Sequence, residues 1–200
     1  MPRAKTRTPE LRDHVLRVAL DMLASEGVAG FTTRRVAAAA STSTPAVYEL
    51  FGDKAGLLRE LFFEGFRQLR RYYEAAPLSD DPIEDVVALT RLYRRFATEN
   101  PQLMRMMFSQ PFAAFDPGPD EARAGGEIRE LIVDRIRRAV DAGALEGDET
   151  DIAHGLLALM VGLGDAEAAS RLGRSKASVD RRWDQTVRAL LRGHAPSTAP

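Results

Sequence analysis

Hydroxyl, cationic and small side chains gather in one stretch of this sequence, between residues 32 and 54. Hydroxyls and methyl groups are small enough to approach the edges of nucleic-acid bases, and a tyrosine hydroxyl or a lysine can bind a phosphate oxygen. A threonine at the start of a helix adds free backbone N–H groups, which also bind anions. The sequence therefore predicts a nucleic-acid contact surface made of Thr32, Thr33, Arg34, Ser43, Thr44, Pro45, Ala46 and Tyr48.

Two short helices with a tight turn between them would hold this surface. The first is expected to start at Thr32 or Thr33 and to end near Ala40. The second is expected to follow the polar break at residues 41–43, with Thr44 as its cap, because the residue before a proline avoids the helical region. Such a pair is typical of a helix-turn-helix, which lays its second helix in the DNA major groove.

The second of these helices has an apolar side and a polar side. Val47 and Phe51 are four residues apart, so they are expected to point together into a small core. The residues left on the outward surface are Ser43, Thr44, Ala46 and Tyr48.

Residues for enzymatic or metal chemistry are scattered. The chain has no cysteine, and His14, His154 and His194 lack a metal-ligand partner three or four residues away. There is no glycine-rich phosphate loop and no nucleophile elbow. We therefore expect neither an enzyme nor a metal or cofactor site.

The charge is unevenly distributed along the 200 residues. Residues 1–73 carry 12 Lys and Arg against 8 Asp and Glu, whereas the whole chain has a net charge of -1. A positive first third on an acidic remainder suits a partner such as DNA. The N-terminus lacks the apolar segment of a secretory signal, and the longest strongly apolar run, residues 156–163, is too short to span a membrane. The expected location is the cytoplasm.

Proline, glycine and capping residues divide the chain into an all-α fold of about nine helices without strands. The expected helices span residues 9–27, 32–40, 44–50, 53–76, 83–100, 101–109, 120–142, 148–171 and 176–193. The expected domains are a flexible basic arm at 1–8, a helix-turn-helix domain at 9–54, a connecting helix at 55–76, a ligand-binding and dimerisation domain at 77–193, and a disordered tail at 194–200.

An ordered set of residues between positions 14 and 62 carries a resemblance to a known family. The set comprises Ala19, Leu20, Leu23, Glu26, Gly27, Phe31, Thr32, Thr33, Arg34, Val36, Ala37, Ala40, Ser43, Val47, Tyr48, Phe51, Asp53, Lys54, Leu57 and Leu58. It resembles the DNA-binding domain of TetR-type transcription regulators, in which a tyrosine is followed by a phenylalanine and then a lysine at intervals of three. The resemblance implies that Thr32, Arg34, Tyr48 and Lys54 touch the DNA backbone, while Ser43, Thr44 and Ala46 lie on the reading surface.

Four positions depart from the family pattern. Ser41 stands where the turn usually has glycine, and a left-handed conformation there would cost about 1 kcal/mol relative to glycine. Thr42 replaces a buried apolar residue, Pro45 replaces a lysine or glycine, and Glu49 replaces a frequent histidine. These differences bear on the DNA sequence preferred rather than on the fold.

The resemblance also implies an effector pocket and a dimer interface in the C-terminal helices. Residues 93–101 resemble a Tyr-x-x-Phe-Ala-x-x-Asn-Pro run of one TetR branch. Methionine and aromatic side chains suit an adaptable apolar pocket, although helical spacing alone also fits an ordinary core. The expected pocket residues are Tyr93, Phe96, Leu103, Met106, Met107, Phe108, Phe112, Phe115, Ile132, Leu156 and Met160. The expected dimer interface comprises Leu156, Leu163, Val179, Trp183, Val187 and Leu190.

Together these expectations describe a homodimeric repressor that binds double-stranded operator DNA and is released by a small apolar effector, with no membrane partner. Three alternatives remain open at the level of sequence. The chain could be a ligand-independent nucleoid or activator protein, a helical scaffold that does not bind DNA, or an enzyme with an unrecognised catalytic group.

Overall fold

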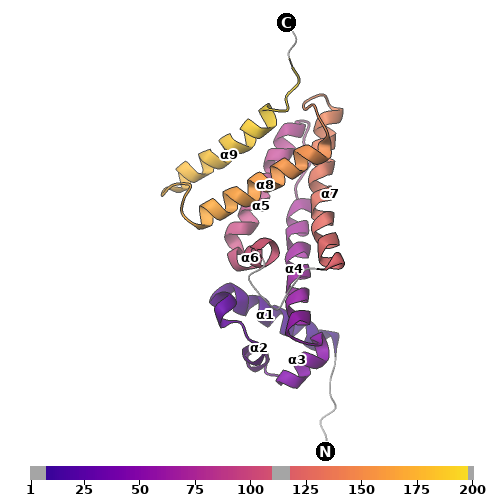
Figure 1. The fold of residues 1–200 in the computed structure, drawn as a ribbon, viewed down its shortest axis with the longest axis vertical. Coiled ribbons are helices and arrows are strands. Elements are labelled where there is room, and N and C mark those ends of the chain that lie inside the picture. Colours follow the sequence, from indigo (N-terminus) through magenta and orange to yellow (C-terminus); the bar gives the residue numbers. More distant parts are fainter. Residues whose placement is uncertain (1–7, 110–117, 198–200) are drawn as a thin grey trace, which may run out of the picture. The chain divides into compact units, whose positions relative to one another are not determined.

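The computed structural model of the chain describes residues 8–109 and 118–197, and these form nine helices and no strand (Figure 1). The helices are α1 (Pro9–Gly30), α2 (Thr33–Ala39), α3 (Thr44–Phe51), α4 (Lys54–Glu74), α5 (Pro82–Glu99), α6 (Pro101–Ser109), α7 (Pro119–Asp141), α8 (Glu149–Ala168) and α9 (Lys176–Arg192). The predicted all-α fold is confirmed. Most of the predicted basic arm, the pocket residues Phe112 and Phe115, and the end of the predicted tail lie outside the described residues.

Capping side chains begin several helices where the sequence predicted. Thr8 Oγ1 accepts a hydrogen bond from the Leu11 amide at 3.3 Å, and Asp53 Oδ1 accepts one from the Gly56 amide at 2.7 Å. Each bond satisfies an amide that lacks a partner within its own helix. The sequence predicted that the first helix ends at Gly27, and the helical backbone is indeed interrupted there, where φ is 67°. One more helical turn follows, so α1 ends at Gly30.

The chain packs as two compact units. The first comprises residues 1–67 and 100–122, and the second comprises residues 68–99 and 123–200. Helix α6 packs against α1 and therefore belongs with the N-terminal helices in the first unit. Helix α4 contributes residues to both units.

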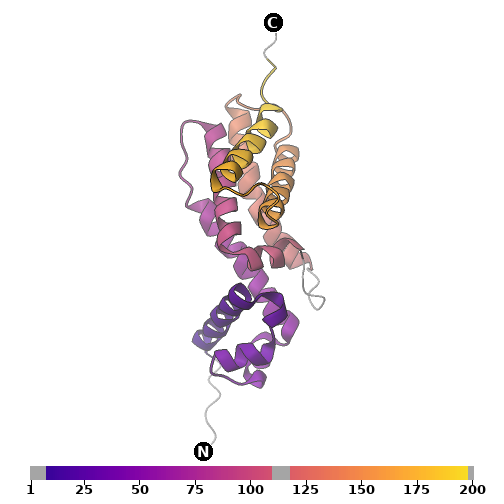
Figure 2. The ribbon, with the colours of Figure 1, turned by 90° about the vertical axis from the view of Figure 1, so that its left-hand side faces the viewer.

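In the first unit, α2 packs against both α1 and α3 (Figure 2). Its core contains Val15, Leu23, Val36 and Val47, all at most 1% exposed. Helix α6 reaches α4 through a close approach at Gly65, where a Cβ atom would lie 2.6 Å from Met107 Sδ and 3.2 Å from Leu103 Cδ1. Only a residue without a side chain permits that separation.

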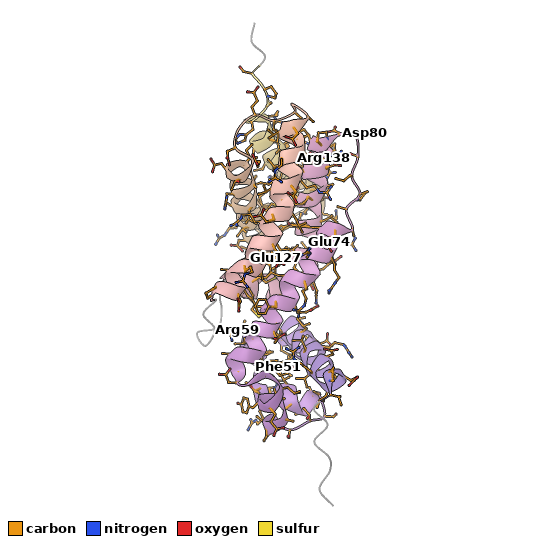
Figure 3. All side chains as sticks on the ribbon, turned by 90° about the vertical axis from the view of Figure 1, so that its right-hand side faces the viewer. Phe51, Arg59, Glu74, Asp80, Glu127 and Arg138 are labelled. Atoms are coloured by element: carbon orange, nitrogen blue, oxygen red, sulfur yellow. The ribbon has the colours of Figure 1, made fainter. Side chains whose placement is uncertain are left out.

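In the second unit, α5 packs against α8 and α9, which also pack against each other (Figure 1). Its apolar interior includes Phe96, Ile132, Ile136, Leu156 and Met160, none of which is exposed. A buried carboxylate fixes the loop before α5: Asp85, 4% exposed, accepts hydrogen bonds from the Ser79 amide at 2.9 Å and the Ser79 hydroxyl at 2.7 Å. The same carboxylate pairs with Arg138 of α7. Figure 3 shows Arg138 toward the end of α7 that is level with Asp80 of this loop.

Candidate nucleic-acid interface

Helix α3 presents one apolar side to the first unit and one polar side to solvent. Val47 is fully buried and Phe51 is 8% exposed, as predicted, whereas Tyr48 is 43% exposed. Phe51 sits at the end of α3 within the first unit (Figure 3). Because Val47 and Phe51 are buried on adjacent turns of α3, the opposite face of α3 is the one available to a partner.

The outward face of α3 carries the side chains that the sequence predicted for base contact. Ser43 and Pro45 are exposed, and Thr44 and Ala46 are half-buried. The predicted cap is corrected by one residue: Ser43, not Thr44, caps α3, because Ser43 has extended backbone angles and its Oγ accepts from the Ala46 amide at 3.2 Å. Thr44 is instead the first helical residue, and its hydroxyl is not used as the cap.

The turn between α2 and α3 departs from the usual glycine without losing its shape. Ser41 adopts a φ of 52°, which lies in the left-handed region. Its amide bonds to the Ala38 carbonyl at 3.1 Å, and the Thr42 amide reaches back to the Ala37 carbonyl at 2.9 Å. This pair of bonds closes the C-terminus of α2, so the turn is held even though a side chain makes the conformation costly.

The start of α2 separates the two predicted threonines. Thr32 is exposed and caps the helix, with its Oγ1 accepting from the Arg35 amide at 3.3 Å. Thr33 is 5% exposed. This corrects its prediction as a contact residue, since its side chain faces the core and only its backbone remains for a phosphate. Arg34 is exposed and forms no ion pair with any described residue, whereas Arg35 pairs with Glu26 of α1.

Lys54 opens α4 directly after α3 and is half-buried. The first turn of α4 passes very close to the end of α3, because a Cβ atom on Gly56 would overlap the Phe51 carbonyl oxygen. Gly56 therefore allows α4 to begin close to the end of α3, and Lys54 is the first residue of α4. Sequence reasoning missed this glycine, although a glycine in the first turn of a long helix was the available signal.

The predicted pocket residues divide between the two units. Leu103, Met106, Met107 and Phe108 belong to the first unit, where Met107 and Leu103 approach α4 at Gly65. The members in the second unit are all at most 1% exposed: Tyr93, Phe96, Ile132, Leu156 and Met160. Burial raises the pKa of the Tyr93 hydroxyl, and the neighbouring Asp165 carboxylate raises it further, so that hydroxyl stays protonated.

A cavity of about 610 Å³ lies in the second unit beside α5 and α9, and it does not involve the predicted pocket residues. Arg94 of α5 pairs with Glu167 Oε2 at 2.8 Å and with Asp180 Oδ1 at 2.7 Å. Trp183 donates to the same Glu167 oxygen at 2.6 Å, and the Arg94 guanidinium lies 5.5 Å from the Trp183 ring centroid. Sequence analysis missed this network because its partners are far apart in the chain.

The predicted dimer interface on α8 and α9 remains a prediction, although most of its residues are buried within one chain. Within the single chain, its members on α8 and α9 are at most 8% exposed, with the exception of the half-buried Leu190. The buried members are Leu156, Leu163, Val179, Trp183 and Val187. Helix α8 is apolar on several sides, so its sequence pattern could not tell the inward side from the outward side.

The outward side of α8 carries small residues instead. Gly155, Ala158 and Gly162 are exposed and recur at spacings of three and four. A Cβ atom added at Gly162 would meet nothing within 4 Å. A surface of this kind lets a second helix approach closely.

Among residues 8–109 and 118–197, no group of three or more histidine, cysteine or acidic side chains is placed to hold a metal ion. No helix in the same residues is long and apolar enough to cross a membrane. His154, one of the three histidines, contacts the Thr150 carbonyl through Nδ1 at 2.8 Å, an interaction within its own helix.

The fold and the exposed face of α3 define the class of the protein: a helix-turn-helix module joined to an all-helical body. Comparison with known families gives the same answer. Residues 15–61 match the tetR family of bacterial regulatory proteins, and residues 86–190 match the tetracyclin repressor-like C-terminal domain. The chain belongs to the TetR family, whose members are non-enzymatic DNA-binding transcription regulators.

Individual relatives and solved structures are similar to this chain in sequence or in fold. HTH-type transcriptional regulators from Mycobacterium bovis and Mycobacterium tuberculosis are 26% identical over 129 residues, which is 63% of this chain and 54% of each relative. The chain thus matches about half the length of these relatives. A protein of unknown function from Rhodococcus sp. RHA1 has the same fold, with a TM-score of 0.79 and 27% identity over 96% of this chain and 98% of that one. The TetR-family regulator PfmR from Thermus thermophilus shares the fold at 20% identity, with a TM-score of 0.68 over 89% of this chain and 97% of that one.

Proposed function

We propose that this protein is a homodimeric transcription repressor that binds a near-palindromic DNA operator and leaves it when a small apolar effector binds. One observation carries the proposal. Helix α3 buries Val47 and Phe51, whereas Tyr48 is exposed and the small residues Thr44 and Ala46 are half-buried. A recognition helix needs a rigid inward face and a small, hydrogen-bonding outward face.

The side chains on this surface fall into two groups by their chemistry. Thr44 and Ala46, at the start of α3, can approach base edges with a hydroxyl and a methyl group. Tyr48, Lys54 and Arg34 instead suit phosphate oxygens, which position the protein without reading sequence. The Tyr48 hydroxyl has no hydrogen-bond partner among the described residues, which leaves it available to a phosphate.

The dimer interface is assigned to the outward side of α8 and the adjoining edge of α9. Gly155, Ala158 and Gly162 would let the same helix of a second copy approach across a two-fold axis. Leu190 of α9 lies at this edge, since a Cβ atom on Gly155 would be 3.8 Å from its Cδ1. Two copies related in this way would place their α3 helices in half-sites about one DNA turn apart, roughly 34–36 Å, or at an adjusted multiple of that distance.

The effector is assigned to the apolar interior of the second unit, around Phe96, Ile132 and Met160. Helix α4 begins next to α3 and ends in this unit, so a change in its position is a physical route from effector to DNA surface. Release of DNA requires the effector to bind one conformation more tightly than the other.

Selection of a random duplex library on the purified protein tests the proposal. The expected result is an enriched near-palindrome whose affinity falls steeply with salt, because the phosphate contacts release counterions. Salt-sensitive binding without an enriched sequence would replace the repressor with a nucleoid protein. Absence of any DNA binding would leave a helical scaffold.

A further inference from the structure

Two buried polar atoms in the second unit lack a hydrogen-bond partner among the described residues. They are the hydroxyl of Tyr73, near the end of α4, and Nη1 of Arg135, on α7. Tyr73 is only 2% exposed. Folded proteins rarely leave buried polar atoms unpaired, because such an atom gives up its bonds to water and receives nothing in return.

The Tyr73 hydroxyl is available as a hydrogen-bond donor. Burial raises its pKa well above the ordinary value, and the neighbouring Tyr93 raises it further, so the phenol keeps its proton. Tyr93, 1% exposed, and the unexposed Phe96 belong to the same buried interior of the second unit. Tyr73 therefore adds one O–H donor to an interior that is otherwise mainly apolar.

Arg135 also has a buried donor without an acceptor. Its Nη2 donates to the Ala76 carbonyl at the end of α4 at 3.2 Å, while Nη1 has no acceptor among the described residues. A guanidinium carries only donors and keeps its charge inside proteins. An acceptor oxygen is therefore the type of atom that can pair with either of these unpaired donors.

In the cavity between α5 and α9, the charged groups already have partners, unlike Tyr73 Oη and Arg135 Nη1. Its central charge, Arg94, makes three hydrogen bonds to two carboxylates, and Arg91 pairs with Asp184 at 2.8 Å. The charges on its walls thus satisfy each other, and a ligand there would have to compete with existing ion pairs. The unpaired donors lie on α4 and α7 instead.

We propose that Tyr73 is the residue that recognises the effector, and that the effector is an apolar molecule bearing an acceptor oxygen, such as a ketone or ester. Arg135 supplies a second donor at the same end of α4. The inference rests on the proposed effector-binding function and adds the chemical class of the ligand. A site that offers a buried donor discriminates against a ligand of the same shape without the oxygen, because that ligand leaves the donor unpaired.

The test uses the full-length protein and three pairs of probes of matched shape. The pairs are 2-heptanone with heptane, acetophenone with ethylbenzene, and benzophenone with diphenylmethane. Affinity is measured by the shift in thermal unfolding across a concentration series. In at least one pair the ketone is expected to bind about tenfold or more tightly than the hydrocarbon, a difference of about 1.4 kcal/mol.

Tyr73→Phe keeps the ring and removes only the hydroxyl. It is expected to abolish the preference for the ketone and to leave the unliganded protein equally stable or more stable, because no protein hydrogen bond is lost. Tyr72→Phe is the matched control: Tyr72 donates to Glu99 on the surface, so the ketone preference should survive.

Three results would overturn the proposal: a ketone preference that persists in Tyr73→Phe, a clear loss of stability in unliganded Tyr73→Phe, or no stabilisation by any probe. The last two would show that the hydroxyl serves the folded protein alone or that this interior admits no ligand. DNA binding without probes is measured on the same preparation, so a failed repressor assignment is distinguished from a failed ligand class.

Discussion

The surface of α3 and the contact between α5, α8 and α9 use polar side chains in opposite ways. Around α3, Tyr48 and Arg34 point outward and have no ion-pair or hydrogen-bond partner among the described residues. Between α5, α8 and α9, the charges of Arg94, Glu167 and Asp180 are paired with one another. The first arrangement keeps its hydrogen-bonding capacity for a partner, whereas the second uses it to hold helices together.

In this chain, unpaired polar groups are better candidates for ligand binding than polar groups that already pair with each other. An ion-pair network whose charges already satisfy each other contributes little binding energy to a ligand, which would have to displace one of the paired groups. Polar groups left unpaired on a rigid helix, or buried without a partner, can gain bonds when a ligand arrives. Both proposals, the DNA surface on α3 and the donor at Tyr73, follow from unpaired groups rather than from the cavity beside α5 and α9.

The largest expected effect comes from the proposed dimer face on α8, because only a dimer could bind two half-sites at once. Gly162→Leu adds a side chain where the single chain leaves open space, so the protomer should fold while close approach of a second α8 is blocked. We expect a monomer by sedimentation and a loss of operator affinity of about 100-fold or more, since the two half-sites no longer bind together.

Gly126→Leu on α7 is the matched control for that variant, because it makes the same change in another helix of the second unit. A dimeric Gly162→Leu protein with normal operator affinity would contradict the assigned interface.

Lys54→Ala and Tyr48→Phe test whether the outward polar groups bind phosphate. Each should weaken binding to all duplex sequences several-fold, and Lys54→Ala should lower the slope of log affinity against log salt by about 1. Fluorescence anisotropy with an operator and an unrelated duplex at several salt concentrations measures both quantities. Arg171→Ala, an exposed arginine of the second unit, should change neither. Equal affinity in all three variants would remove the phosphate contacts from the account.

Asp85 tests the opposite principle, that polar groups in the second unit stabilise the fold. Burial alone would raise the pKa of Asp85, but hydrogen bonds from Ser79 and Arg138 lower it overall. A carboxyl whose pKa is lower when folded adds stability above its unfolded value of about 3.9, and that stability is lost as pH falls further. Asp85→Asn should therefore cost about 1–3 kcal/mol at pH 7 and flatten the loss of stability below about pH 4.

Denaturant unfolding between pH 3 and 7 measures that prediction. Asp80→Asn changes an exposed carboxyl of the same loop and should have little effect (Figure 3). If Asp85→Asn and Asp80→Asn behave alike, the buried ion pair does not stabilise the second unit.

The smallest expected effect lies in the turn that carries α3. Ser41 has a φ of 52°, so Ser41→Gly should stabilise the protein by about 1 kcal/mol by relieving the left-handed strain. Ala38→Gly, at an exposed helical position three residues earlier, should have the opposite sign and a similar size. Thermal unfolding measures the stability of both variants. Destabilisation by Ser41→Gly would mean that the Ser41 side chain stabilises the turn.

The sequence predicted the α3 surface better than the body because the two regions differ in pattern. Val47, Tyr48 and Phe51 sit on a helix with one apolar side, so their directions followed from helical spacing. Helix α8 is apolar around most of its circumference, and spacing could not show that Leu156 faces inward while Gly162 faces outward. The Arg94 network joins residues 73 and 86 positions apart, and no local pattern indicates it.

The most direct test of the central claim compares the operators selected by two versions of the protein. A random duplex library is selected in parallel on the unchanged chain and on Thr44→Val, which removes one hydroxyl from the first turn of α3. We predict that both select near-palindromes with the same half-site spacing and that the preferred bases differ symmetrically at corresponding positions of the two half-sites. Identical operators, or an operator without symmetry, would contradict the claim that α3 reads the DNA in a dimer.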